Sequence, residues 1–160
     1  MMLWAKYGAL FLIAILIESN LSWFYEIGTH TPDLILILLI FIAIRNGKIK
    51  GTSTGFTFGL IEDLIVSVGF LGLSSFTKSV TGFIMGYFSE SRRSRLFPGI
   101  MFPTSIGIIV NEVIGTMFRI AGTSEGIISA ILTKAIPSSI YTFVVAFIIL
   151  FIFKPAEELL

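Results

Sequence analysis

The sequence predicts an all-α, single-domain polytopic membrane protein with six transmembrane helices and both termini in the cytoplasm. The chain of 160 residues is 55% hydrophobic and only 13% charged, whereas about 25% of the residues in a soluble domain are charged. The mean hydropathy is +0.96, and the polar residues are confined to short breaks between apolar runs. Because one bilayer span takes about 20 residues, six spans consume nearly the whole chain. This excludes a soluble catalytic domain or a nucleic-acid-binding domain.

The first two apolar runs differ in length. The first covers residues 3–24, and aromatic residues lie at both of its ends, as is typical of the two membrane interfaces. We interpret it as a retained span, since no small-residue cleavage site follows it. The second covers residues 31–45 and opens at Thr31-Pro32-Asp33, a favourable helix start. It reaches only ~22 Å, so we expect it to be thinly covered or recessed at one end.

Four further apolar runs complete the predicted bundle. They cover residues 49–68, 71–89, 98–120 and 136–153. Residues 123–135 are predicted to be helical as well. The sequence leaves open whether this segment lies in the membrane interface or lengthens the last span.

The distribution of charges over the breaks predicts the orientation. One side collects Lys6, Arg45, Lys48, Lys50, Arg92, Arg93, Arg95 and Lys154. The other side has Glu26, His30, Asp33 and Glu125, with Arg119 and Lys134 near its boundary. Because Lys and Arg accumulate on the cytoplasmic side of membrane proteins, both termini are predicted to lie there, in agreement with the even number of spans.

Two stripes of residues at four-residue spacing predict how the third and fourth spans pack. They are Gly51, Gly55, Gly59 and Asp63 in the third span, and Lys78, Gly82 and Gly86 in the fourth. Residues at this spacing share one helix face, and small residues let two helix backbones approach closely. We predict that Asp63 pairs with Lys78, which places Gly59 opposite Gly82 and Gly55 opposite Gly86. This contact is either packing with one buried ion pair or a functional polar site.

Charged residues inside the spans form a predicted polar layer in the outer half of the bundle. Its members are Glu18, Glu62, Asp63, Lys78 and Glu112. A charge near the centre of a membrane helix costs ~2.5–3.5 kcal/mol, so each needs a partner or a function. The layer is either an internal salt-bridge network or a small-molecule cavity that opens to the outside.

The sequence gives no support to an enzyme. The chain has no Cys and a single His, so we expect no disulfide, no metal site and no cofactor. Residues 51–55 match G-x-S-x-G, and residues 75–78 match S-x-x-K. Neither pattern has the partner residues that a serine nucleophile requires, so we expect no catalytic residues.

An ordered set of short motifs runs from residue 31 to residue 90. The set comprises Pro32-Asp33-Leu34, Arg45-Asn46-Gly47, Gly51-x3-Gly55-x3-Gly59-Leu60-Ile61-Glu62-Asp63-Leu64, Gly69-x2-Gly72-Leu73 and Lys78-x3-Gly82-Phe83-x2-Gly86. In this order the motifs resemble the MreD family of rod shape-determining proteins. Glu62 departs from the family pattern, in which a polar, uncharged residue precedes the Asp.

The resemblance implies a non-enzymatic, multi-pass scaffold of the bacterial cytoplasmic (inner) membrane that takes part in cell elongation and cell-shape regulation. Members of the family work beside the bitopic protein MreC, the actin-like MreB filament, and the RodA transglycosylase with its penicillin-binding partner. The fold of the family is similar to the S component of energy-coupling-factor transporters. The alternative function is therefore a substrate-binding subunit of a vitamin-type transporter.

Candidate contact residues follow from the predicted orientation. On the cytoplasmic side they are Arg45, Lys48, Lys50, Arg92, Arg93 and Arg95. Such residues more often act as orientation signals and contact anionic membrane lipids. On the outer side Glu26, His30 and Asp33 are candidates for contact with MreC. No nucleic-acid partner is expected.

Overall fold

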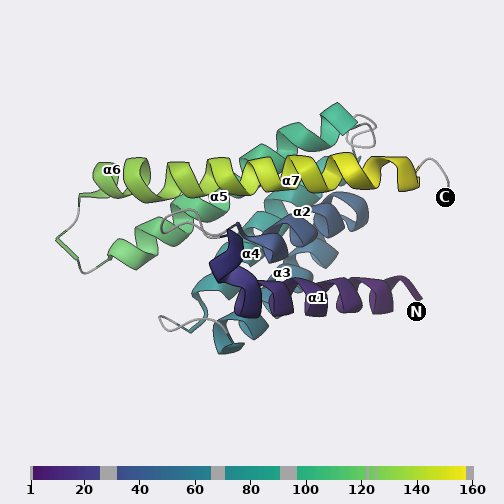
Figure 1. The fold of residues 1–160 in the computed structure, drawn as a ribbon, viewed down its shortest axis with the longest axis horizontal. Helices are drawn as coiled ribbons and strands as arrows, with labels where there is room; N and C mark the ends of the chain where they lie inside the picture. The colour runs from purple at the N-terminus through teal and green to yellow at the C-terminus, as the bar shows by residue number, and fades with distance from the viewer. Residues whose placement is uncertain are drawn as a thin grey trace.

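A computed structural model describes residues 2–25, 32–65, 71–90, 97–121, 123–124 and 126–157, and within these ranges all regular structure is helical (Figure 1). The elements are α1 (Met2–Tyr25), α2 (Leu34–Asn46), α3 (Lys48–Ile65), α4 (Leu73–Gly86), the 3-10 turn η1 (Tyr87–Glu90), α5 (Phe97–Ile120), α6 (Ile127–Ala130), the π-helical turn η3 (Ile131–Ala135) and α7 (Ile136–Glu157). The predicted all-α fold is therefore confirmed for the described residues.

Helix α2 runs through the middle of the bundle, because it is apolar on every side. Eight of its 13 residues are buried. One of its faces packs with Met85 of α4, Ile108 of α5 and Ala146 of α7. The opposite face packs with α1 and α3, where the ring of Phe11 stacks on the ring of Phe58 at a centroid distance of 4.1 Å. A helix that is hydrophobic all round must be covered on all sides, and the other helices provide that cover.

Helices α3 and α4 form a hairpin in which two backbones touch. A Cβ atom added to Gly51 would overlap the carbonyl group of Gly82, and one added to Gly82 would overlap that of Gly51. A Cβ atom at Gly55 would overlap the backbone of Lys78. The glycine stripes therefore face each other as predicted, and their function is to let the helices pack without side chains between them.

The register of this hairpin differs from the predicted one. Gly82 faces Gly51 rather than Gly59, and Gly86 faces the backbone of Lys48 rather than Gly55. The prediction was wrong by eight residues, about two helical turns. It assumed that the nearest acid on the adjacent helix neutralises Lys78. The observed register instead places Asp63 beside the first turn of α4.

The last helix is longer than predicted. Helical structure continues from Ile127 through η3 into α7, so residues 127–135 extend the last helix. The π-helical turn lies just before Pro137, whose ring would clash with the carbonyl four residues earlier in a regular helix. In the widened turn the N–H of Ile136 donates to the carbonyl oxygen of Ile131. The turn therefore carries the helix across the proline.

Two helical segments of the described residues are long and apolar enough to cross a bilayer, namely Ile100–Ile120 and Ile127–Ile149. Two shorter apolar segments are Tyr7–Ser19 and Leu34–Asn46. This agrees with a helical membrane protein, while the count of six spans stays a prediction. The start of α1 and the end of α7 lie at the same end of the bundle (Figure 1).

Candidate functional site

Helix α2 begins inside the bundle, where its first N–H groups have no partner within the helix. Two carboxylates satisfy them. The N–H of Leu36 donates to Asp33 Oδ1 at 2.6 Å, so Asp33 is the N-cap. The N–H groups of Leu34 and Ile35 donate to Glu18 Oε1, on α1, at 2.6 and 3.2 Å. Negative charge is also favourable here, because the helix dipole is positive at this end. Glu18 of α1 therefore fixes the start of α2.

Helix α4 begins in the same way. The N–H groups of Gly72 and Ser75 donate to Asp63 Oδ2 at 2.9 and 3.2 Å, and that of Ser74 donates to Oδ1 at 3.2 Å. Asp63 lies in the last turn of α3 and is buried. The end of α3 therefore caps the start of α4, and this fixes the end of the hairpin that lies away from Gly86.

Lys78 joins the two helix starts. Its side chain is only 2% exposed, and its Nζ atom lies 2.7 Å from Asp33 Oδ2 and 2.6 Å from Glu62 Oε2. These three residues come from α2, α3 and α4. Asp33 therefore caps α2 with one carboxylate oxygen and binds Lys78 with the other. The ion pairs connect all three helices at one depth in the bundle.

The predicted partner of Lys78, Asp63, was wrong; Lys78 pairs with Asp33 and Glu62 instead. Consecutive residues of a helix point about 100° apart, so Glu62 faces Lys78 while Asp63 faces the first turn of α4. The observed register accounts for this difference. It also gives Glu62, whose role the sequence left open, a position as the second partner of Lys78.

The role of Asp33 was missed as well. The sequence indicated Thr31 as the N-cap, and Asp33 as an acid that favours the positive end of the helix dipole and as an outer contact residue. In the structure the carboxylate is 17% exposed and is occupied by Leu36 and Lys78, so it does not form part of an outer docking surface. The short length of α2 was the feature of the sequence that could have indicated this role. A short helix can begin inside the bundle, and its N-cap then lies at the depth of the buried charges.

Glu112 is the last member of the predicted polar layer. Glu112 is buried on α5, beside Asn111, whose side-chain oxygen is buried without a hydrogen-bond partner. On α7 the buried hydroxyl of Thr142 accepts a hydrogen bond from the N–H of Asp33 at 3.4 Å. Five predicted residues lie outside those that the structure describes: Glu26, His30, Arg92, Arg93 and Arg95.

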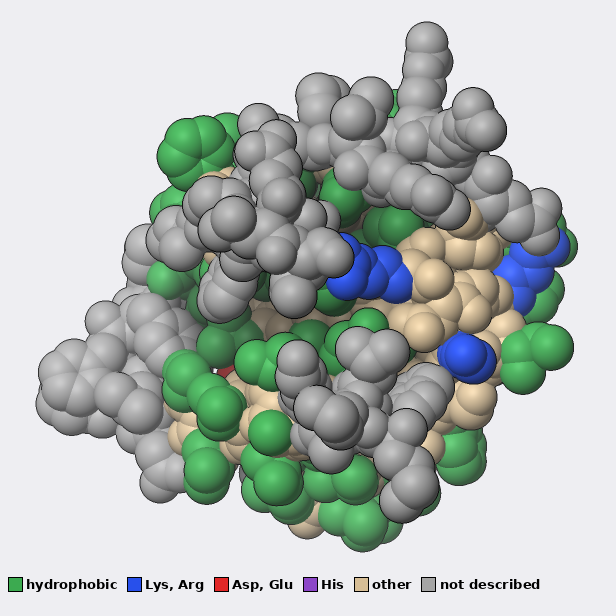
Figure 2. Space-filling model, turned by 90° about the vertical axis from the view of Figure 1, so that its right-hand side faces the viewer, with side chains coloured by type: hydrophobic (Ala, Val, Ile, Leu, Met, Phe, Trp, Pro, Cys, Tyr) green, Lys and Arg blue, Asp and Glu red, His purple; other side chains and the backbone are tan. Residues whose placement is uncertain are grey.

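Three of the predicted cytoplasmic contact residues, Arg45, Lys48 and Lys50, lie together at one end of the bundle. Glu18, late in α1, caps the start of α2, so these two helices are antiparallel and Arg45 lies at the end where α1 begins. Lys48 and Lys50 follow at the start of α3. Figure 2 looks at this end of the molecule and shows Lys and Arg side chains on it. The Arg45 guanidinium lies 4.6 Å from the ring centroid of Phe41.

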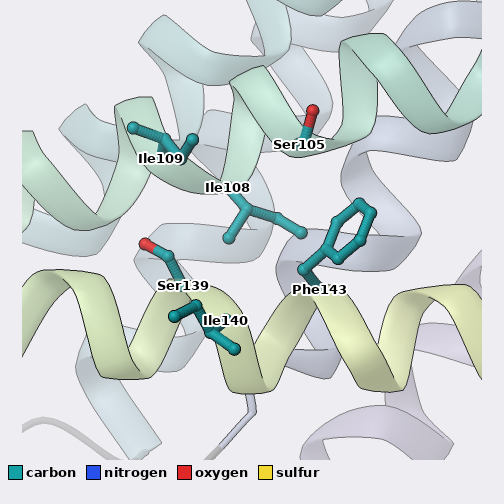
Figure 3. A pocket seen from close by; sticks show the side chains of 6 residues that line it. All are labelled: Ser105, Ile108, Ile109, Ser139, Ile140 and Phe143. Carbon is teal, nitrogen blue, oxygen red and sulfur yellow. The ribbon is translucent and has the colours of Figure 1, made fainter.

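Two pockets lie along the groove between α5 and α7. The first has a volume of about 230 Å³. It is lined by Ser105, Ile108, Ile109, Ser139, Ile140 and Phe143 (Figure 3). The second, of about 370 Å³, shares three of these residues and continues toward η3. Neither pocket is lined by a charged residue, so the buried charges do not line a ligand cavity of this groove.

The arrangement is suited to holding helices together rather than to acid–base chemistry. Glu18 and Asp63 bind helix N–H groups, and Glu62 binds Lys78. Asp33 binds both an N–H group and Lys78. Within the described ranges no three His, Cys, Asp or Glu side chains are grouped so as to hold a metal ion. Four members of the predicted polar layer, Glu18, Glu62, Asp63 and Lys78, therefore take part with Asp33 in helix caps and ion pairs.

Comparison with known proteins identifies the family. The family model described as "rod shape-determining protein MreD" matches residues 2–155. No curated protein and no solved structure matches the chain, so the expected similarity to transporter S components stays a prediction. The family match covers almost the whole sequence and includes every residue of the network around Lys78. The chain therefore belongs to the MreD family of rod shape-determining proteins.

Proposed function

We propose that this protein is a multi-pass scaffold of the cytoplasmic membrane that links an MreC-type bitopic protein to the peptidoglycan synthesis factors of the rod-shape complex. The observation that carries the proposal is the family match over residues 2–155. The network around Lys78 supports it, because charges that are occupied by helix starts and by one another hold a shape rather than process a substrate.

The proposed orientation places both termini in the cytoplasm and six helices across the membrane. Two observations support it. The start of α1 and the end of α7 lie at one end of the bundle (Figure 1). The same end carries Arg45, Lys48 and Lys50, as the distribution of positive charge in membrane proteins requires.

The two ends of the bundle then have different proposed partners. The basic end faces the cytoplasm, where Arg45, Lys48 and Lys50, together with the three arginines at 92, 93 and 95, would meet a cytoplasmic component such as an MreB filament. The opposite end, on which the sequence predicts Glu26 and His30, would meet the part of an MreC-type protein that lies outside the cytoplasm. RodA and its penicillin-binding partner would contact the remaining helix faces.

Co-purification tests this function. The protein is co-expressed with the MreC protein and, separately, with the MreB protein of the same genome. Both are expected to be retained on the tagged chain after detergent extraction. Reversing the charge of Arg92, Arg93 and Arg95 is expected to reduce the retention of MreB without lowering expression. The matched control is Lys134→Glu, at the opposite end, which should leave MreB retention unchanged.

Two results would contradict the scaffold function. One is the absence of MreC from the purified complex while the protein is folded and membrane-inserted. The other is saturable binding of a small metabolite by the purified chain, which would support the transporter alternative. If charge reversal alters only membrane insertion, the arginines are orientation signals rather than contact residues.

A further inference from the structure

The side chains that form the ion pairs of Lys78 differ in how completely the protein covers them. Lys78 itself is only 2% exposed, and Asp63, which caps the start of α4, is buried as well. The side chains of Asp33 and Glu62, in contrast, are 17% and 16% exposed. Part of each of these two acidic side chains is therefore left uncovered by protein.

The uncovered part of Glu62 does not belong to the apolar outer face of α3. Leu60, two residues before Glu62, is exposed on the other side of the helix, because residues two apart point about 160° away from each other. Glu62 itself points toward α4, where its Oε2 atom lies 2.6 Å from Lys78 Nζ. Its exposed part therefore lies on the side of α3 where α2 and α4 pack.

Water fits this position better than a lipid chain does. A charge in contact with hydrocarbon costs ~2.5–3.5 kcal/mol near the centre of a membrane helix, so charged side chains inside membrane proteins face the bundle interior or a water-filled cavity. The charges of the ion pairs also do not cancel, because Asp33 and Glu62 share a single lysine. Water can solvate the second carboxylate, whereas a hydrocarbon chain cannot.

The amide of Asn111 indicates a polar interior at a similar level. Its side-chain oxygen is buried and accepts no hydrogen bond from the residues that the structure describes, and buried polar atoms of this kind are usually bonded to ordered water. Along the antiparallel helices α4 and α5, Met85 meets Gly107 and Phe76 packs on Phe118. Asn111 lies between these two contacts, as does the lysine of the ion pairs. A second polar group that needs a water partner is therefore found at the level of the first.

The uncovered acidic side chains lie near one end of the bundle. Glu62 is three residues from the end of α3, ~5 Å along the helix, and fourteen residues from Lys48 at the basic end, ~21 Å. From these observations we propose that a narrow water-filled crevice enters the bundle at the end opposite Lys48 and reaches the carboxylates of Asp33 and Glu62. In the proposed orientation this end faces away from the cytoplasm, so the inference rests on the proposed membrane placement.

Silver ions test the proposal, because Ag⁺ blocks a thiol that water reaches and does not enter hydrocarbon. The chain contains no cysteine, so single cysteines can be introduced. Asp33→Cys and Glu62→Cys each leave Lys78 with one carboxylate, and variants are used if they elute from size-exclusion chromatography like the parent. Right-side-out membrane vesicles that contain each variant are exposed to silver nitrate in chloride-free buffer. The protein is then denatured, and maleimide-polyethylene glycol shifts every unblocked chain on a gel.

Two exposed apolar positions provide the matched controls. Ile140→Cys changes a position of α7 that is 60% exposed and lies two residues from Thr142, whose hydroxyl accepts the N–H of Asp33. This control therefore lies close to the depth of Asp33, within the long apolar segment of the last helix. Leu60→Cys lies about half a turn from Glu62 on α3. A difference within either pair reports the direction in which the side chain faces rather than its depth.

We expect Ag⁺ to abolish most of the gel shift at positions 33 and 62 and to leave it at positions 140 and 60, although the two controls are the more exposed. A full gel shift at position 33 or 62 in a folded variant would overturn the proposal, and so would blockage that occurs in inside-out vesicles alone. Blockage at positions 140 and 60 as well would contradict the membrane placement itself, and the inference would fail with it. If one of the two variants does not fold, the other decides by itself.

Discussion

The two halves of the molecule are held together by different forces. In the half formed by α2, α3 and α4, backbones touch at Gly51 and Gly82, and buried charges connect the helices at Lys78. In the half formed by α5 and α7, the helices are longer, and a groove remains between them. Short helices that begin inside a bundle need partners for their N–H groups. The carboxylates that bind helix N–H groups therefore lie where the short helices α2 and α4 begin.

We therefore expect the α2–α4 half to be rigid and the α5–α7 half to be adaptable. Lipid chains are as apolar as leucine, so helices in a membrane gain little from burying apolar surface against each other. Close backbone packing and satisfied polar groups must supply the specificity. We expect substitutions in the α2–α4 half to be costly and equivalent substitutions in the α5–α7 half to be tolerated.

The largest expected effect is that of Lys78→Met. The change leaves the buried carboxylates of Asp33 and Glu62 without their common partner, and removing one member of a buried ion pair costs ~3–5 kcal/mol. We expect most of the folded protein to be lost, as measured by size-exclusion chromatography of detergent extracts after a temperature series. Lys134→Met, at an exposed position of η3, is the control and should behave like the parent.

A second variant identifies the partners of Lys78. Adding Asp33→Asn and Glu62→Gln to Lys78→Met removes the unpaired charges and should recover part of the lost stability. The exchange Asp63→Lys with Lys78→Asp should not, because Asp63 binds the start of α4. Recovery by that exchange would contradict the observed register of the hairpin.

The next effect is that of Gly82→Ala. The added methyl group would overlap the carbonyl of Gly51, so the two helices must separate, at a cost of ~1–3 kcal/mol. Gly115→Ala on α5 is the matched control. There a Cβ atom would meet only the guanidinium of Arg119, at 3.5 Å, and the higher helix propensity of alanine favours the variant. Thermal denaturation of both proteins in one detergent measures the difference. Equal loss at both positions would mean that the glycine contact is not decisive.

The sequence predicted the local features of this structure but not the tertiary ones. Local patterns predicted the helical class, an acid near the start of α2, the close approach of the glycine stripes and the shortness of α2. The register of α3 against α4 was not predictable from them, because glycines at four-residue spacing fit equally well after a shift of one or two turns. The partners of Lys78 depend on that register and on where α2 begins, which is a tertiary property. Asp33 was therefore predicted to lie near a helix start, but neither as its N-cap nor as an ion-pair partner.

A moderate effect is expected from Asp63→Ala. The change removes the acceptor for three N–H groups at the start of α4, and losing a helix cap costs ~0.5–2 kcal/mol. Asp63→Asn keeps an oxygen acceptor and should lose less stability than Asp63→Ala. Hydrogen exchange in the first turn of α4 provides a local measurement, and faster exchange is expected there than in the middle of α5. Unchanged protection of that turn in Asp63→Ala would show that other groups cap the helix.

The smallest effect is expected from Ser105→Leu, and the same substitution at Ser75 provides the comparison between the two halves. Ser75 is buried at the start of α4, where its N–H and hydroxyl face Asp63, so Ser75→Leu inserts extra volume into a filled contact and should cost ~1–3 kcal/mol. Ser105 lines the open groove between α5 and α7 (Figure 3). Ser105→Leu finds space there, and exchanging a lipid contact for a protein contact changes little, so a change within about 0.5 kcal/mol is expected. Thermal denaturation of the two variants in lipid nanodiscs measures both values. If Ser105→Leu is as destabilising as Ser75→Leu, the groove is occupied by a bound lipid or partner and the α5–α7 half is not the adaptable one.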